Sequence, residues 1–128
     1  MKIEELKVYS LSMEMAESIW VIVIRWDYFA KDTIGRQLIR AADSIAVNLS
    51  EGFGRYHYKE NIHFSYYSRG SLSETKTWLI KARNRHLISS SDYENFTKQI
   101  DDIGVKLNNY IKSIGKKPPK QLNDSEAE

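Results

Sequence analysis

Apolar residues recur every three or four positions along most of the chain, and this spacing predicts helices. The first predicted helix runs from about Leu6 to Asp27. Its apolar positions form two neighbouring rows: Leu6, Tyr9, Met13, Ala16, Trp20 and Val23 in one, and Met15, Ile19, Ile22 and Trp26 in the other. One row would face a core, so two rows indicate a helix that is covered on more than one side.

The second predicted helix contains residues 36–55, RQLIRAADSIAVNLSEGFGR. Its expected core face consists of Leu38, Ala41, Ala42, Ile45 and Leu49. We expect a short connection over residues 28–32 before it, with Asp32 or Thr33 as the N-cap. The helix should weaken near Gly52 and Gly54, because glycine costs about 1 kcal/mol relative to alanine inside a helix.

The third predicted helix runs from about Lys59 to Arg85. One of its rows holds Phe64, Tyr67, Ser71, Glu74 and Trp78, and the adjacent row holds Ser68, Leu72, Thr75, Leu79 and Ala82. Gly70 and Ser71 in mid-helix are expected to let a neighbouring backbone come close.

The fourth helix is expected to begin at Ser91, which has the capping-box spacing to Glu94. Its core row is Tyr93, Phe96, Ile100, Ile103, Leu107, Tyr110 and Ile114, and Gly115 should end it. Residues 116–128 hold few apolar side chains and two prolines, which predicts a disordered polar tail. Four such helices with short connections predict an all-α domain over residues 1–115, an antiparallel up-down-up-down four-helix bundle.

A polar stripe runs along the second helix, because Arg40, Ser44, Asn48, Glu51 and Arg55 are spaced 4, 4, 3 and 4 residues apart. Short side chains flanked by arginines suit a crowded environment with directional hydrogen bonds. The alternative interpretation is an ordinary exposed face.

Charge is unevenly distributed along the chain. The net charge is +2, but residues 33–87 hold nine Lys and Arg against four Asp and Glu. A polyanion such as RNA or DNA is the natural partner of such a segment, although many helical proteins with a mildly basic surface bind no nucleic acid. Basic and aromatic residues also alternate within 55–59 and 66–69, which suits phosphates and stacked bases. The candidate phosphate contacts are Arg36, Arg40, Arg55, Lys59, Arg69, Lys76, Lys81, Arg83 and Arg85.

The sequence offers no catalytic or cofactor pattern. There is no cysteine, hence no disulfide or thiolate metal site, which fits a cytoplasmic protein. The first ten residues hold no long apolar core followed by a small-residue cleavage site, so we expect no signal peptide. The most apolar run, residues 19–24, is far shorter than the roughly 20 residues of a membrane span. Glu60 and His63 form the one Glu-x-x-His motif, whereas a di-iron bundle needs two. We therefore expect no metal, no cofactor, no membrane partner and no enzymatic activity.

Several short motifs in a fixed order resemble the 23S rRNA intervening-sequence protein family, also called the four-helix bundle protein family. They are Leu6-Lys7-Val8-Tyr9, Gln37-Leu38, residues 40–45 (RAADSI), Asn48, Glu51-Gly52, Arg55, Phe64, residues 70–72 (GSL), Glu74, Leu79 and Ala82. The resemblance covers about residues 6–114. Ser68 stands where that family more often has alanine.

The resemblance implies a bacterial protein that assembles into a homo-oligomeric ring or barrel, with pentamers expected. It also implies kinship with the accessory subunit of diversity-generating retroelements, which binds nucleic acid and a reverse transcriptase. The leading hypothesis is therefore a non-enzymatic, homo-oligomeric nucleic-acid-binding protein. The alternative is a protein-interaction scaffold, such as an accessory subunit of a reverse transcriptase.

Six residues that are not among the candidate phosphate contacts are assigned to a subunit interface or polar network. In such a network, Arg40 or Arg69 could pair with Glu51 or Glu74 of another subunit. The six residues are Ser44, Asn48, Glu51, Gly70, Ser71 and Glu74.

Overall fold

The computed structural model describes residues 1–115, and this part of the chain is helical without strands. Four long helices make the body of the molecule: α1 (Lys7–Val23), α3 (Arg36–Phe53), α4 (Tyr58–Asn84) and α5 (Ser90–Gly115). Three short elements accompany them: the 3-10 turn η1 (Ile3–Glu5), the helical turn α2 (Tyr28–Ala30) and the π-helical turn η2 (Lys31–Gly35).

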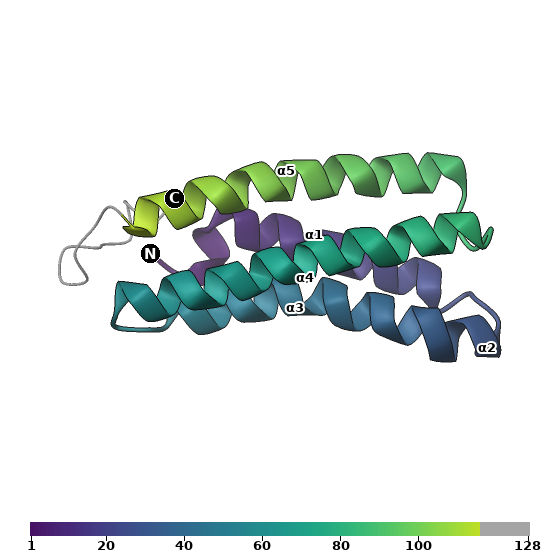
Figure 1. Cartoon of the computed structure of the whole chain (residues 1–128), viewed down its shortest axis with the longest axis horizontal. Helices are drawn as coiled ribbons and strands as arrows, with labels where there is room; N and C mark the ends of the chain where they lie inside the picture. Colours follow the sequence, from purple (N-terminus) through teal and green to yellow (C-terminus); the bar gives the residue numbers. More distant parts are fainter. Residues whose placement is uncertain (116–128) are drawn as a thin grey trace.

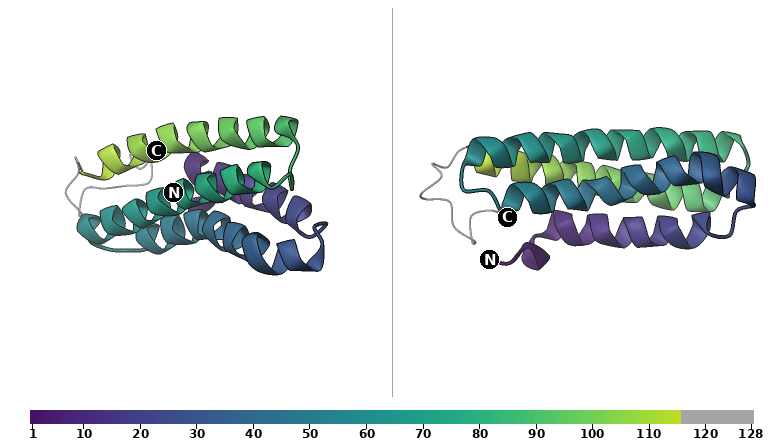
Figure 2. Two further views of the ribbon diagram at one scale, coloured as in Figure 1. Left: turned by 45° about the vertical axis from the view of Figure 1, so that its right-hand side comes forward. Right: turned by 90° about the horizontal axis from the view of Figure 1, so that it is seen from below.

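The long helices form an antiparallel bundle in which successive helices are neighbours. α1 packs against α3 and α5, and α4 packs against the same two helices, so α1 and α4 lie diagonally opposite (Figures 1 and 2). The predicted four-helix bundle is therefore confirmed for the described residues.

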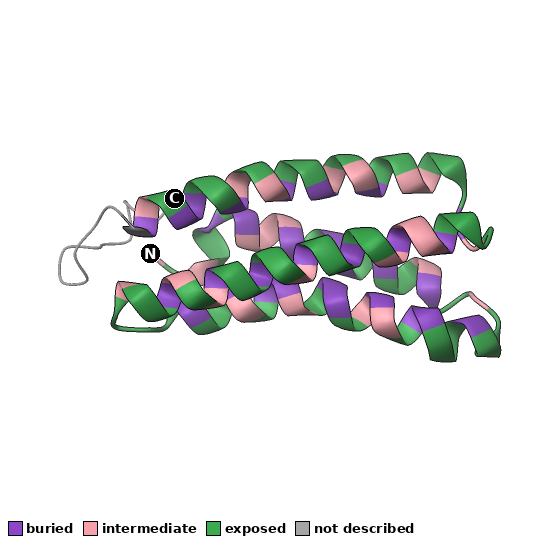
Figure 3. Cartoon of the chain, viewed as in Figure 1, coloured by how far each residue is buried: buried purple, intermediate pink, exposed green. Residues whose placement is uncertain are grey.

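The core is built from the rows that the periodicity indicates for three of the helices (Figure 3). The predicted α3 face is buried throughout, and on α5 the row is buried from Phe96 to Ile114. On α4 the row from Ser68 to Ala82 is buried, whereas its neighbour is only partly covered, with Tyr67 and Glu74 exposed.

Polar side chains occupy much of the buried face of α4, and hydrogen bonds satisfy them. Ser68 donates its hydroxyl to the carbonyl of Ile45 on α3 (2.7 Å). The Asn61 amide donates to the hydroxyl of Tyr110 on α5 (3.2 Å), and the hydroxyl of Ser65 lies 3.5 Å from the Asn61 oxygen. These bonds tie α4 to both of its neighbours, and each removes the cost of an unpaired buried group.

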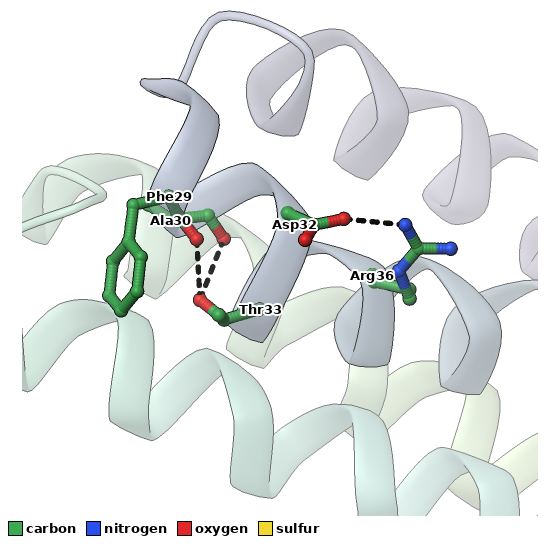
Figure 4. A network of polar contacts seen from close by, with 5 residues as sticks. All are labelled: Phe29, Ala30, Asp32, Thr33 and Arg36. Atoms are coloured by element: carbon green, nitrogen blue, oxygen red, sulfur yellow. Dashed lines mark hydrogen bonds and ion pairs between the residues drawn. The ribbon is translucent and has the colours of Figure 1, made fainter.

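The prediction of a non-helical connection over residues 28–32 was wrong. α2, η2 and α3 follow one another directly, so one helix spans residues 28–53. Asp27 is its N-cap, since its Oδ1 accepts a bond from the amide of Ala30 (3.0 Å). The two predicted caps lie inside the helix instead: Asp32 pairs with Arg36, and the Thr33 hydroxyl donates to the carbonyl of Phe29 (Figure 4).

The cap predicted for the last helix was displaced by two residues. Ser89, not Ser91, caps α5, because its hydroxyl oxygen accepts from the amide of Asp92 (3.0 Å). Residues 89–91 are all serines, and each can act as an N-cap. The prediction chose Ser91 because of its capping-box spacing to Glu94, and this choice was wrong. α5 reaches Gly115, and the predicted tail, residues 116–128, lies outside the described residues.

On α1, both apolar rows contribute to the core, since Leu6, Ala16 and Val23 of the first row are buried. Met15 and Ile19 of the second row are buried, whereas Met13 and Trp20 of the first row are 42% and 50% exposed. Because α3 and α5 both pack against α1, this helix is covered on more than one side, while Met13 and Trp20 stay about half exposed within residues 1–115.

The two mid-chain glycines also differ. Gly52 lies against α4, and a Cβ there would stand 2.6 Å from Oδ1 of Asn61 and 2.9 Å from Cβ of Phe64. A Cβ on Gly70 would meet no atom within 4 Å, so the close approach predicted there is absent within residues 1–115. Gly52 therefore permits the close α3–α4 contact, which is the role assigned to Gly70.

Candidate nucleic-acid interface

The nine predicted phosphate contacts do not share one surface. Two lie on α3, five on α4, and two lie just outside a helix: Arg55 after α3 and Arg85 after α4. Some of them form ion pairs with nearby acids, and the others form no ion pair within residues 1–115 and can contact phosphates.

Two arginines of the set are neutralised by nearby acids. Arg36 pairs with Asp32, four residues before it in the same helix. The hydrogen bond and the charge of Asp32 raise the pKa of Arg36, with a smaller contribution from Tyr28. Arg55 lies 3.2 Å from Glu51 and 3.8 Å from Glu60, and its guanidinium covers the ring of Phe64. These exposed pairs reduce the charge that a polyanion would meet.

Three cations of α4 form one row. Arg69, Lys76 and Arg83 follow at seven-residue intervals, about 10.5 Å apart along the axis for a rise of 1.5 Å per residue. Seven residues are nearly two turns, so all three lie on the side of α4 next to α5. None of them forms an ion pair within residues 1–115.

Contacts to α5 and a neighbouring ring orient the two arginines of this row. Arg69 donates from Nη1 to Oδ1 of Asn108 (3.1 Å) and stacks over Tyr66 at 4.8 Å from the ring centroid. Arg83 stacks over Tyr93 of α5 at 4.2 Å. Each guanidinium is thus held by a neutral group, which leaves its charge uncompensated.

A groove between α4 and α5 runs beside this row. It has a volume of about 460 Å³, an apolar floor that includes Leu72 and Ile100, and one acid, Asp101. Phosphates can follow the cationic edge while the apolar floor accommodates sugar or base surface. The lining residues are Arg69, Leu72, Ser73, Lys76, Ile100, Asp101, Gly104, Val105 and Asn108.

The α5 residues of this groove were absent from the sequence-based prediction. Asn108 orients Arg69, and Val105 is 60% exposed at the groove edge. No local pattern in the sequence distinguishes Asn108 from its neighbour Asn109, because its role depends on the packing of α5 against α4.

The remaining candidate cations are spread over other surfaces. Arg40 on α3, Lys59 and Lys81 on α4, and Arg85 form no ion pair in the part of the chain described. Lys81 is only half-buried and the others are exposed.

The residues assigned to a polar network, apart from Gly70, bond to residues four positions away in the sequence. Ser44 donates to the carbonyl of Arg40 (2.7 Å), and Asn48 donates to the carbonyl of Ser44 (2.9 Å). Glu51 pairs with Arg55. On α4, Glu74 accepts from the indole of Trp78 (3.2 Å), and the Ser71 carbonyl accepts from Thr75 (2.8 Å). Within residues 1–115 neither Glu51 nor Glu74 pairs with Arg40 or Arg69, so a role between subunits remains a prediction.

The opposite side of the bundle, between α1 and α3, is apolar and acidic. A groove of about 280 Å³ runs there, lined by Tyr9, Met13, Ala46, Val47, Ser50 and Glu51. Partial burial and, secondly, the charge of Glu17 raise the pKa of Asp43, which places these two carboxylates near each other on this side.

Among residues 1–115, no three His, Cys, Asp or Glu side chains come together in a metal-binding group. Glu60 of the Glu-x-x-His motif lies near Arg55 instead. No helix in this part of the chain combines the length and hydropathy required to cross a membrane.

Comparison with known proteins gives a family and a fold. Residues 4–109 match the family described as "23S rRNA-intervening sequence protein". A similar solved structure is a protein of unknown function from the S23 ribosomal protein family of Bacteroides thetaiotaomicron VPI-5482. It has a TM-score of 0.73 and 21% identity, over 82% of this chain and 95% of that chain. No curated protein matches.

Proposed function

Because the chain belongs to the 23S rRNA-intervening sequence protein family, we propose that it is a non-enzymatic, homo-oligomeric protein that binds nucleic acid. The row of Arg69, Lys76 and Arg83 beside the α4–α5 groove carries this proposal. Three unpaired cations at regular spacing fit the phosphates of a strand that lies along α4.

The homo-oligomeric part of the proposal rests on exposed apolar side chains of α1 and α3. Met13 and Val47, which line the apolar groove between α1 and α3, are 42% and 59% exposed, and Trp20 on the same helix as Met13 is 50% exposed. Exposed apolar patches on the surface of a domain mark contacts with another protein, and a second copy is the partner that the family resemblance suggests. The basic row lies on the other side of the bundle and stays accessible in such an assembly.

Fluorescence anisotropy across a salt series tests nucleic-acid binding. The purified full chain is titrated into labelled structured RNA, duplex DNA and an RNA–DNA hybrid. We expect the affinity to fall steeply with salt, with a slope that reports the number of phosphate contacts. Absence of binding to all three, even near about 50 mM salt, overturns the proposal.

A second candidate function is a protein-interaction scaffold, such as an accessory subunit of a reverse transcriptase. The apolar groove between α1 and α3 favours it, since that surface suits a protein better than a polyanion. A protein partner that co-purifies after nuclease treatment, together with no salt-dependent binding of nucleic acid, would favour this candidate over the first.

A further inference from the structure

Two adjacent aromatic rings project into solvent at one end of the bundle. Tyr28 and Phe29 of α2 are 76% and 78% exposed, more than any other large apolar side chain in the described residues. Neither ring stacks on another ring or on a cation within residues 1–115. By contrast, Tyr66 is covered by Arg69, and Tyr56 packs edge-on against His57.

The backbone that carries these rings is held firmly. Asp27 caps the helix, the Thr33 hydroxyl donates to the carbonyl of Phe29 (2.7 Å), and the π-helical turn η2 continues directly into α3. Gly35 in that turn presses on the end of α1, where a Cβ would lie 2.7 Å from Cγ1 of Val23. Figure 4 shows Phe29 directed away from the pair of Asp32 and Arg36. The backbone that carries the two rings is therefore already fixed before a ligand binds, and this lowers the entropy cost of binding.

This end of the bundle is also where the basic row of α4 ends. The indole of Trp26, two residues before Tyr28, donates to the carbonyl of Leu87 (3.0 Å), and this bond joins the α1–α2 and α4–α5 connections. Figure 1 shows both connections at the same end. Arg83, the last cation of the row, is four residues before Leu87.

Exposed cations lie close to the rings in the sequence and at the same end of the bundle (Figure 1). Arg25 and Lys31 flank them in the sequence and are exposed, and Arg85 follows α4 at the same end. The two acids of the segment already have partners, since Asp27 accepts from the amide of Ala30 and Asp32 pairs with Arg36. Free aromatic faces at an end of the bundle that also carries unpaired cations suit unpaired bases and their phosphates better than they suit an apolar protein surface.

We propose that Tyr28 and Phe29 form a stacking platform for unpaired bases of the nucleic acid that the α4 row binds. The ligand class is then a single-stranded or looped segment of RNA or DNA, because the bases of an intact duplex are stacked on one another and closed to a side chain. This inference rests on the proposed function and specifies its ligand.

The test compares the wild-type full chain with the double variant Tyr28→Ala/Phe29→Ala. The probes are labelled single-stranded RNA of mixed sequence, the same strand in its full duplex, and the DNA counterparts of both. We expect single-strand binding to weaken roughly tenfold or more, and duplex binding to change less than about twofold. The dependence of affinity on salt should stay the same, because neither ring is charged.

Three further variants make the result specific. Tyr28→Phe/Phe29→Tyr retains both rings and should bind single strands like the wild type. Val21→Ala trims another exposed apolar side chain (45%), on α1 and without an aromatic ring, and should leave single-strand binding unchanged. An adenine analogue whose fluorescence is quenched by stacking should be quenched by the wild type and not by the double alanine variant.

The outcomes separate this inference from the proposed function. Wild-type protein that binds no probe overturns the proposed function itself. Wild-type binding that the double variant leaves intact, or weakens equally for duplex and single strand, overturns the stacking platform alone. A lower mass of the double variant by light scattering would also overturn it, because the rings would then be contacts between copies of the chain.

Discussion

The two long sides of the bundle present opposite chemistry on the same architecture. Between α4 and α5, a groove of about 460 Å³ is edged by Arg69 and Lys76, and one acid, Asp101, lies in it. Between α1 and α3, a smaller groove of about 280 Å³ is edged by Met13 and Val47. The first side suits a ligand attracted by charge, and the second suits a ligand held by apolar contact, so the two sides differ in the kind of partner they would favour.

The largest expected effect comes from removing the charge of the α4 row. The variant Arg69→Gln/Lys76→Gln/Arg83→Gln should weaken nucleic-acid binding strongly and make the slope of log affinity against log salt shallower by about 2–3. Lys7→Gln/Lys98→Gln/Lys112→Gln removes the same charge from cations outside this groove that form no ion pair within residues 1–115, and it is the matched control. An equal loss of binding in both variants would show that total charge matters and the row does not.

The next effect concerns the α1–α3 side and the mass of the assembly. Met13→Glu/Trp20→Glu places two charges on the exposed apolar face and should lower the mass by light scattering toward 14.9 kDa. Circular dichroism should show an unchanged helix content, since both side chains are already about half exposed. Tyr56→Glu is the control at an exposed site away from this groove. A wild-type chain that is monomeric at micromolar concentration would contradict the prediction.

A smaller effect separates the two glycines. Gly52→Ala should destabilise the fold by about 1–3 kcal/mol, because its Cβ collides with Asn61 and Phe64 of α4. Gly70→Ala meets no atom in the chain and should stabilise α4 by about 0.5–1 kcal/mol through helix propensity. Urea unfolding measures both. If Gly70→Ala lowers the mass of the assembly instead, another subunit approaches α4 at that position.

The smallest effect is a pH dependence on the α1–α3 side. The raised pKa of Asp43 means that the folded state holds this proton more tightly than the unfolded chain does. The ionised carboxylate therefore opposes folding at neutral pH, and the cost disappears as the pH falls below the unfolded pKa of about 4. Asp43→Asn should raise the free energy of unfolding at pH 7 by at most about 0.3 kcal/mol, given the exposure of this group. Destabilisation by Asp43→Asn at pH 7 would contradict the assignment.

Sequence patterns predicted the bundle well where one row is apolar and its neighbours are polar. α5 is the best example, because only one of its faces could form a core. The buried face of α1 could not be predicted for the opposite reason. Both of its rows are apolar, so periodicity could not decide whether Met13 or Met15 is buried. Three consecutive serines likewise left the cap of α5 undetermined, since each can accept the same type of bond.

The candidate site could be predicted in part. The cations of α4 follow from charge counting and helical spacing, and the structure selects three of them by their position next to α5. The contribution of Asn108 could not be predicted, because it arises from a contact between residues 39 positions apart. The exposure of Tyr28 and Phe29 was missed because residues 28–32 carry no apolar repeat that would reveal a helix.

The π-helical turn at Lys31–Gly35 has a consequence for the register of the chain. A π turn holds one residue more than an α turn, and each α-helical residue rotates the chain by about 100° around the axis. The direction in which Tyr28 and Phe29 face is thus set by a single surplus residue, independently of the α3 core face. Deleting Thr33 would restore regular α geometry and rotate Tyr28 and Phe29 relative to Leu38 and Ile45, but the same rotation would turn Ala30 out of its buried position. The surplus residue therefore lets the rings face solvent while Ala30 and the α3 core face both stay packed.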